Sequence, residues 1–163
     1  MAWTVGMPRD EADPRPGAEH WVPEHADLDA LRAAAPDCRG CELWRDATQV
    51  VFSTGSANAR IVLVGEQPGD REDLEGEPFV GPAGRLLAEA VEAAGLDPGD
   101  LYITNAVKHF RFERRGKRRI HEKPGIAHID ACRPWLTPSS RSSAPPSSCV
   151  SARPPLVRSS AAA

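Results

Sequence analysis

The fold is decided by one stretch of the chain, Arg60-Ile61-Val62-Leu63-Val64-Gly65-Glu66-Gln67-Pro68-Gly69. Its first half is apolar and β-branched, which is typical of a strand buried on both faces of a parallel sheet. Its second half is a turn bounded by two glycines at the carboxyl end of that strand. Ligands bind at this end of the strands in open α/β sheets. We therefore expect a functional site on this turn.

Helical and strand patterns alternate on both sides of the stretch. The expected helices are Leu28–Ala35, Gly84–Ala94 and a segment from Gly125 to Leu136. The other expected strands are Thr48–Phe52, followed by a polar turn over Ser53–Ala59, and Leu101–Val107, which ends near Asn105. This alternation predicts an α/β fold, a three-layer α/β/α sandwich with a short parallel central sheet.

The length of 163 residues suits one domain with its own core. Residues 1–18 are rich in Pro, Gly and charge, and we expect them to be disordered. The folded domain is expected over residues 19–136. Residues 137–163 are dominated by Ser, Pro, Ala and Arg without periodicity, which predicts a disordered tail. No apolar run is long enough to span a membrane and no secretion signal is present, so we expect a cytoplasmic protein. We also expect it to be a monomer.

The net charge of −3 hides a basic segment. Residues 108–123 contain eight Lys or Arg side chains and only two acidic ones. Such a concentration of positive charge on a mildly acidic chain indicates a local contact with a polyanion. A solvated loop or helix face is the alternative on charge alone.

Four cysteines are present, at Cys38, Cys41, Cys132 and Cys149. In a cytosolic protein a Cys-x-x-Cys pair is more often a metal or redox site than a disulfide. Cys38 and Cys41 offer two thiolates from one turn, and Cys132 can add a third from a helix.

Several ordered motifs resemble those of one enzyme family. The segments Gly65–Asp70, Glu77–Gly84 and Ile103–Lys108 are similar to motifs of the family-4 uracil-DNA glycosylases. Gly116–His121 resembles the loop that marks the UdgX subgroup of that family. The match covers roughly Leu28 to Leu136. It implies a uracil-DNA glycosylase-like fold and an enzyme of DNA repair that hydrolyses the N-glycosidic bond of uracil in DNA.

The resemblance also implies a [4Fe–4S] cluster, whose fourth cysteine follows the third by some sixteen residues. Cys149 lies seventeen residues beyond Cys132, so it fits this position loosely. Zinc is the alternative, because four cysteines also suit a tetrahedral zinc site. A cluster would be structural here, since glycosidic hydrolysis transfers no electrons.

Each pocket motif has a chemical task and a plainer alternative. Gly65 lets the backbone approach a ligand closely, or it belongs to a plain strand-to-helix turn. Glu66 occupies the catalytic acid position that the resemblance implies, or it is a capping acid, and Gln67 is expected to line the pocket with its backbone. Phe79 is a platform for a flipped base, or a core residue. Asn105 offers one donor and one acceptor to the edge of uracil, or it forms a turn.

The basic loop directly follows the strand that carries Asn105. Lys117, Arg118 and Arg119 can neutralise phosphates of uracil-containing DNA, with single strands preferred. His121 ends the loop, and in the UdgX subgroup this histidine bonds to the sugar carbon that uracil leaves. His109 is the rival histidine, but it lies outside the motif.

The resemblance stops after Leu136. Residues 137–163 contain no histidine, so the His-Pro-Ser motif of the family is absent. A shifted reading frame over Thr137–Leu156 permits an amphipathic helix, a Val-rich strand and a cysteine, so we expect a truncated or frame-shifted end. Two alternatives to the trapping enzyme follow, a uracil-DNA binding protein without turnover and an inactive fragment.

Overall fold

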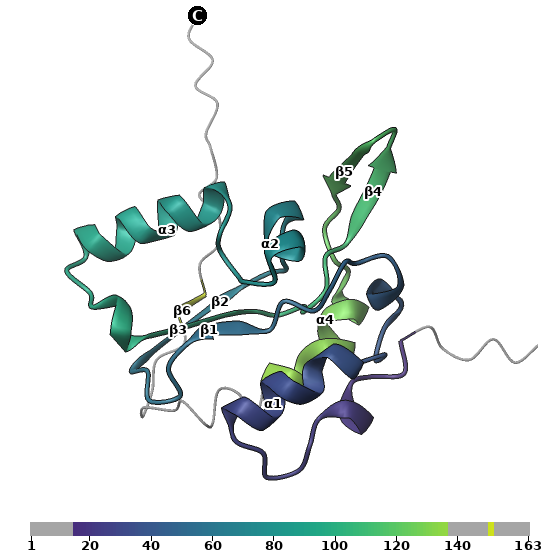
Figure 1. Ribbon diagram of the computed structural model, residues 1–163, viewed down its shortest axis with the longest axis horizontal. Coiled ribbons are helices and arrows are strands. Elements are labelled where there is room, and N and C mark those ends of the chain that lie inside the picture. Colours follow the sequence, from purple (N-terminus) through teal and green to yellow (C-terminus); the bar gives the residue numbers. More distant parts are fainter. Residues whose placement is uncertain (1–14, 137–149, 152–163) are drawn as a thin grey trace, which may run out of the picture.

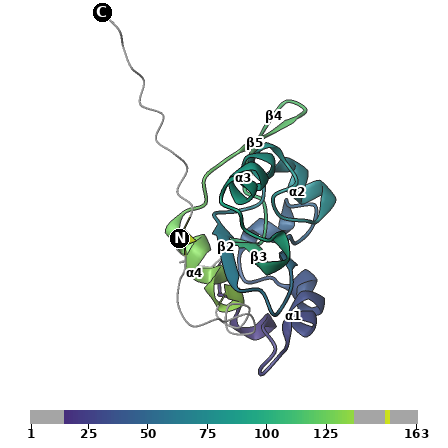
Figure 2. The same ribbon diagram turned by 90° about the vertical axis from the view of Figure 1, so that its left-hand side faces the viewer.

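The computed structural model describes residues 15–136 and 150–151. Its helices and strands are α1 (Leu28–Ala34), β1 (Ser53–Gly55), β2 (Ile61–Gly65), α2 (Asp70–Glu75), α3 (Pro82–Ala93), β3 (Leu101–Asn105), β4 (Phe112–Arg115), β5 (Arg118–His121), α4 (Ile126–Cys132) and β6 (Val150–Ser151). Short 3₁₀ turns cover Glu19–Trp21, Ala35–Asp37, Glu42–Arg45, Pro98–Asp100 and Arg133–Trp135. Helices α2 and α3 lie on one face of the central sheet, and α1 and α4 lie on the other (Figures 1 and 2). The expected three-layer α/β fold is confirmed.

The central sheet has the strand order β1-β3-β2-β6. Strand β2 is parallel to both β3 and β6, as expected, but β1 is antiparallel to β3. The sheet is therefore mixed rather than wholly parallel. The register of β2 and β3 places Gly65 opposite Asn105, so two predicted site residues share the carboxyl edge of the sheet.

The expected strand over Thr48–Phe52 is wrong, and of the polar turn expected over Ser53–Ala59 only the part after β1, at residues 57 and 58, is a turn. The edge strand β1 lies further along the chain, at Ser53–Gly55. Contacts with α2 explain the shift. The backbone N–H of Thr48 donates to the Asp73 carboxylate, and the amide of Gln49 donates to the carbonyls of Asp73 and Leu74. These bonds tie residues 48 and 49 to α2.

Two prolines set helix ends that periodicity alone placed differently. Helix α3 begins at Pro82, whose missing N–H costs nothing in the first turn. Helix α4 ends at Cys132 and continues only as a 3₁₀ turn, because Pro134 cannot donate to the preceding turn. Cys132 thereby lies at the end of α4.

The basic segment forms a hairpin that projects from the body of the molecule (Figure 1). Strands β4 and β5 pair from Phe112 opposite His121 to Arg115 opposite Arg118, which leaves a two-residue turn. Gly116 is the first turn residue and has a φ of 62°. Such a turn favours glycine there because other residues rarely adopt a positive φ. The hairpin returns the chain so that His121 ends near the sheet.

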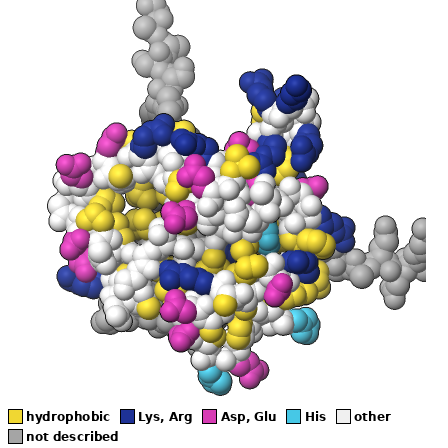
Figure 3. Space-filling view, viewed as in Figure 1, with side chains coloured by type: hydrophobic (Ala, Val, Ile, Leu, Met, Phe, Trp, Pro, Cys, Tyr) yellow, Lys and Arg dark blue, Asp and Glu magenta, His cyan; other side chains and the backbone are white. Residues whose placement is uncertain are grey.

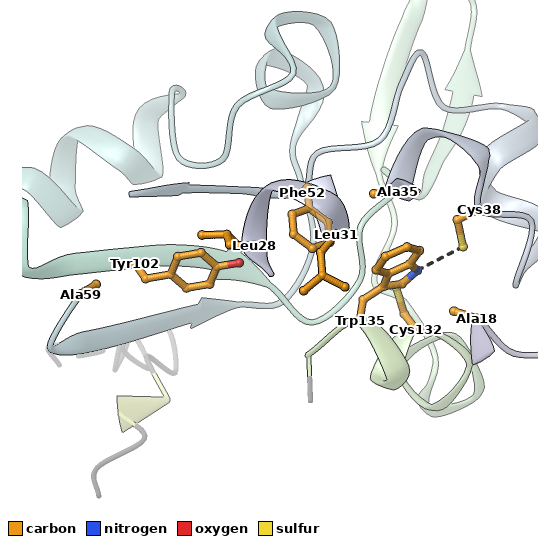
Figure 4. Close-up of a cluster of buried hydrophobic side chains, with 10 residues drawn as sticks. All are labelled: Ala18, Leu28, Leu31, Ala35, Cys38, Phe52, Ala59, Tyr102, Cys132 and Trp135. Carbon is orange, nitrogen blue, oxygen red and sulfur yellow. Dashed lines mark hydrogen bonds between the residues drawn. The ribbon is translucent and has the colours of Figure 1, made fainter. Parts of the chain in front are cut away.

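The main core lies between the sheet and the layer of α1 and α4. Figure 4 shows its buried side chains, among them Tyr102, Phe52 and Trp135. The rings of Phe52 and Trp135 pack edge to face, with 5.6 Å between their centroids. Ala18 also belongs to this core, and its N–H donates to the carbonyl of Ala131 at 2.8 Å. The packed part of the chain therefore begins before residue 19.

The rest of the N-terminal segment and most of the C-terminal tail lie outside the described residues, as does Cys149. Within the tail, Val150 and Ser151 pair with β2. None of the helices in the described part of the chain is both long and apolar enough to cross a bilayer.

Candidate functional site

A pocket of about 390 Å³ opens at the carboxyl edge of the sheet. Four residues singled out from the sequence line it together: Gln67, Phe79, Asn105 and His121. The other lining residues come from the turn after β2 and from the starts of α2 and α3: Gly69, Asp70, Arg71, Glu72, Pro82 and Ala83. The side chains come from four separate segments, so tertiary folding alone assembles the pocket.

Gly65 lets the pocket wall close. A Cβ added at this position would lie 2.2 Å from Oδ1 of Asn105 and 2.8 Å from the ring of Phe79. No real Cβ atom makes such contacts, so a side chain here would displace one of these residues. The sequence predicted that the backbone at Gly65 approaches a ligand closely. In the structure this close approach is to other residues of the pocket.

Phe79 is held in an unusual backbone conformation. Its φ is 61°, which is rare for a bulky residue. A Cβ at Gly84 would lie 1.5 Å from the carbonyl oxygen of Phe79, so α3 packs directly on this backbone. Strain of this kind persists only where the surroundings impose it, and it gathers at functional sites.

Asn105 ends β3 and is almost completely buried. Its backbone carbonyl accepts a hydrogen bond from Nζ of Lys108 at 2.9 Å. No described residue forms a hydrogen bond with its side-chain amide, which lines the pocket. A buried amide without partners is costly. A bound ligand with one donor and one acceptor would satisfy it.

His121 enters the pocket from the hairpin. Its Nε2 lies 2.8 Å from Nε2 of Gln67, and its ring lies 5.9 Å from that of Phe110. The Gln67 amide also accepts from the N–H of Arg111 at 3.0 Å and donates to the carbonyl of Glu122 at 2.9 Å. Gln67 was expected to line the pocket with its backbone. Its side chain instead ties both ends of the hairpin to the pocket.

Glu66 is exposed and is not among the residues that line the pocket. Its backbone carbonyl accepts a hydrogen bond from the N–H of Val107 at 3.0 Å. The carboxylates that do line the pocket, Asp70 and Glu72, are both engaged. Glu72 accepts from the N–H groups of Gly69 and Gly81 at 3.1 and 2.8 Å and so ties two pocket loops together.

Arg119 anchors the hairpin to α2. Its guanidinium contacts Oδ1 of Asp70 at 2.6 Å and Oδ2 of Asp73 at 2.5 Å, and it donates to Oγ1 of Thr48 at 3.1 Å. The Asp73 side chain is fully buried. Sequence reasoning assigned Arg119 to phosphates and missed Asp73. The charge of Arg119 is therefore paired with the carboxylates of Asp70 and Asp73, not left free for a phosphate.

Other basic residues of the segment differ in their exposure. Lys108 is fully buried, and its Nζ donates to Oγ1 of Thr104 at 2.5 Å. Its ammonium group therefore does not reach the protein surface, where a phosphate would bind. Burial lowers the pKa of Lys108 to about 8. Lys117 and Arg118 are exposed on the hairpin. Figure 3 shows Lys and Arg side chains gathered on this projection.

Three thiols lie in the opposite layer. Cys38 and Cys41 come from the turn after α1, Cys132 comes from the end of α4, and all three are buried and free of disulfides. The indole N–H of Trp135 donates to Sγ of Cys38 at 3.2 Å (Figure 4). Among residues 15–136 no three potential ligands are placed to hold one metal ion.

Burial raises the pKa of Cys41 to about 11 and that of Cys132 to about 12. A ligand that binds thiolates must displace protons from such groups. The donor set of three buried cysteines and an N–H directed at one sulfur fits a cysteine-held cluster in its chemistry.

Comparison with known proteins shows the family of the chain. Residues 52–150 match the Uracil DNA glycosylase superfamily. The chain belongs to that superfamily. It is 48% identical over 81 residues to a type-4 uracil-DNA glycosylase of Archaeoglobus fulgidus, which covers 50% of the chain and 41% of the relative. It is 40% identical over 111 residues to a type-4 uracil-DNA glycosylase of Saccharolobus solfataricus, and this aligned region covers 68% of the chain and 48% of the relative.

The matched part of the chain thus spans less than half the length of these two relatives. The superfamily match includes β1, β2, β3 and the hairpin, and so every residue that lines the pocket. The expected relation to uracil-DNA glycosylases is confirmed at the level of the superfamily.

Proposed function

We propose that this protein is a uracil-DNA glycosylase of the UdgX type, which removes uracil from single-stranded DNA and then bonds to the abasic sugar through His121. One observation carries the proposal. The unpartnered amide of buried Asn105, the ring of Phe79 and the imidazole of His121 line the same pocket. A base reader, a stacking surface and a nucleophile are what such a reaction needs.

The reaction begins with the base in the pocket. Asn105 hydrogen-bonds the edge of uracil and Phe79 packs on its face. The bond between C1′ and N1 breaks, the electron pair leaves with uracil, and C1′ becomes electron-poor. A lone pair on a ring nitrogen of His121 then forms a bond to C1′. The imidazole loses the proton on its other nitrogen to water, and the adduct is left neutral.

Glu66 keeps the role of the assisting carboxylate in this proposal. The pocket carboxylates Asp70 and Glu72 are already engaged by Arg119 and by backbone N–H groups. Glu66 follows Gly65 at the same edge of the sheet and is exposed. From there it would reach water or the sugar at the rim of the pocket.

We further propose that Cys38, Cys41 and Cys132 hold a [4Fe–4S] cluster, with Cys149 as a candidate fourth ligand. When bound, the cluster supplies a cross-link between the turn after α1 and the end of α4, with no electron transfer in the reaction. The partner is uracil-containing DNA, with Lys117 and Arg118 at its phosphates. We expect the protein to act as a cytoplasmic monomer in DNA repair.

A labelled single strand with one deoxyuridine tests the proposal on a denaturing gel. The protein should give a heat-stable shifted band that thymine-containing DNA does not give. His121→Ala should abolish the band, while alkali cleavage still reveals abasic sites. The buried His109 provides the matched control, because His109→Ala should keep the band.

Two outcomes would contradict the proposal. A band that survives in His121→Ala places the trapping residue elsewhere. A shift on a native gel without any band on the denaturing gel indicates the alternative function, binding of uracil-DNA without bond formation.

A further inference from the structure

A second hollow lies next to the pocket, between the hairpin and α2. It has a volume of about 490 Å³ and is lined by Asp70, Leu74, Arg114, Lys117, Arg118, Arg119 and Ile120. We call it the hairpin groove. Asp70 lines both the groove and the pocket, so the two hollows adjoin at this residue.

The groove collects the free positive charge of the hairpin. Arg111, Arg115 and Arg119 are each paired with a carboxylate. In the described part of the chain, Arg114, Lys117 and Arg118 take part in no ion pair, and all three line the groove. Free cations on one wall, rather than spread over the surface, indicate an anionic ligand that lies in this groove.

The groove also offers apolar surface. Leu74 is 58% exposed although it is a large hydrophobic residue, and Ile120 also lines the groove. The one carboxylate of the lining, Asp70, is held by Arg119 at 2.6 Å, so it repels an anion less than a free acid would. The groove thus combines cations with an apolar patch.

We propose that the hairpin groove binds the nucleotide next to uracil in a single strand, with its phosphate on the cations and its base against Leu74 and Ile120. The inference rests on the proposed function only in that uracil occupies the adjoining pocket. A single strand fits better than a duplex, because the face of a base is free to meet an apolar side chain only when it is unstacked.

Salt dependence tests the phosphate contact. The probe is a short single strand with one 2′-fluoro-deoxyuridine, whose fluorine slows bond breakage so that reversible binding can be measured. Each released phosphate contact changes the slope of log Kd against log salt by about 0.7 for single strands, or about fivefold in Kd for each tenfold change in salt. Arg114→Ala, Lys117→Ala and Arg118→Ala should each lower the slope by up to this amount.

Lys123→Ala is the matched control, since Lys123 is exposed and basic, belongs to the same segment and does not line the groove. Its slope should stay that of the unsubstituted protein. Equal slopes for the groove variants and the control would overturn the phosphate contact.

A spacer scan tests the base contact. Leu74→Ser should raise Kd by about threefold, which is the effect expected when a leucine side chain that the ligand partly buries is lost. Leu86→Ser should have no effect, since Leu86 is similarly exposed at 61% and lies outside the groove. Abasic spacers are then placed at the neighbours of uracil, one at a time. The penalty of Leu74→Ser should vanish for one of these positions. A penalty that is equal for every strand, or absent, overturns the base contact.

Failure of the inference and failure of the proposed function give different results. If uracil strands bind better than thymine strands but the groove variants match their controls, the groove inference falls and the function stands. If uracil and thymine strands bind equally while the groove variants behave as expected, the groove binds single strands and the proposed function falls.

Discussion

Gln67 and His121 meet with 2.8 Å between their Nε2 atoms, although 54 residues separate them in the chain. With the Gln67 amide donating, the Nε2 of His121 is the nitrogen that accepts this hydrogen bond. The same Gln67 accepts from Arg111 and donates to Glu122. One amide therefore sets both the position of the hairpin and the nitrogen of His121 that carries a lone pair.

We expect Gln67→Glu to slow formation of the DNA adduct at pH 7 and to leave uracil release in place. A carboxylate at this point accepts a hydrogen bond from the ring N–H and favours the charged imidazole, which has no lone pair to attack C1′. The rate of adduct formation should recover as the pH rises. Gln67→Ala removes the contact without adding charge, so it should slow the adduct without this pH dependence. Superimposable pH profiles for the two variants would contradict the assignment.

Arg119→Met should detach the hairpin from α2. Its removal leaves the fully buried carboxylate of Asp73 with the N–H of Thr48 as its remaining donor. We expect a loss of about 2 kcal/mol in the free energy of unfolding, below the full cost of breaking a buried pair because Arg119 is partly exposed. Urea denaturation measures this loss.

Arg115→Met is the matched control for Arg119→Met, because its pair with Glu113 is exposed on both sides and is worth at most about 1 kcal/mol. Adding Asp73→Asn to Arg119→Met should restore part of the lost stability. No difference between the Arg119 and Arg115 variants would show that the clamp contributes little.

Acid should destabilise the protein through His109. Burial lowers the pKa of His109 to about 4 from its ordinary value of 6.5. The unfolded chain therefore takes up a proton at a higher pH than the folded one, and stability is lost as the pH falls from 6.5 toward 4. The loss approaches about 3 kcal/mol. His109→Phe should remove this part of the pH dependence in urea titrations, whereas exposed His20→Phe should retain it.

Asn105→Asp should reduce the preference for uracil over cytosine, on the order of 100-fold. The substitution replaces the donor of the amide with an acceptor that faces a carbonyl of uracil. Release of each base from matched single strands measures the preference. Asn58→Asp, on an exposed turn, should leave it unchanged. Unchanged discrimination in Asn105→Asp would mean that another group reads the base.

The purified protein should contain four iron atoms and show the brown colour of an iron–sulfur cluster. Cys41→Ser should abolish the bound iron, and Cys149→Ser should do so only if Cys149 is the fourth ligand. Metal analysis distinguishes the alternative, because a colourless protein with stoichiometric zinc would contradict the cluster.

The sequence predicted most of the pocket, because its residues stand in motifs at strand ends. Strand β2 and the end of β3 at Asn105 follow from apolar runs bounded by turn residues, and parallel strands bring such ends together. The edge strand β1 was misplaced, since bonds from residues 48 and 49 to α2 override local propensity. Asp73 was missed because a buried acid within an acidic helix looks like a solvent-facing one until its partner is known.

By itself, the sequence determined the α/β layers, the glycine turn after β2 and the position of His121 at the end of a basic loop. These depend on local periodicity and on turn residues such as Gly69. Only the tertiary structure decided which charges are free. Lys108 is buried in the core, Arg119 is held by Asp70 and Asp73, and Arg114, Lys117 and Arg118 remain unpaired in the groove. Charge in a sequence is a property of each side chain, but its availability to a ligand depends on partners that only folding brings within reach.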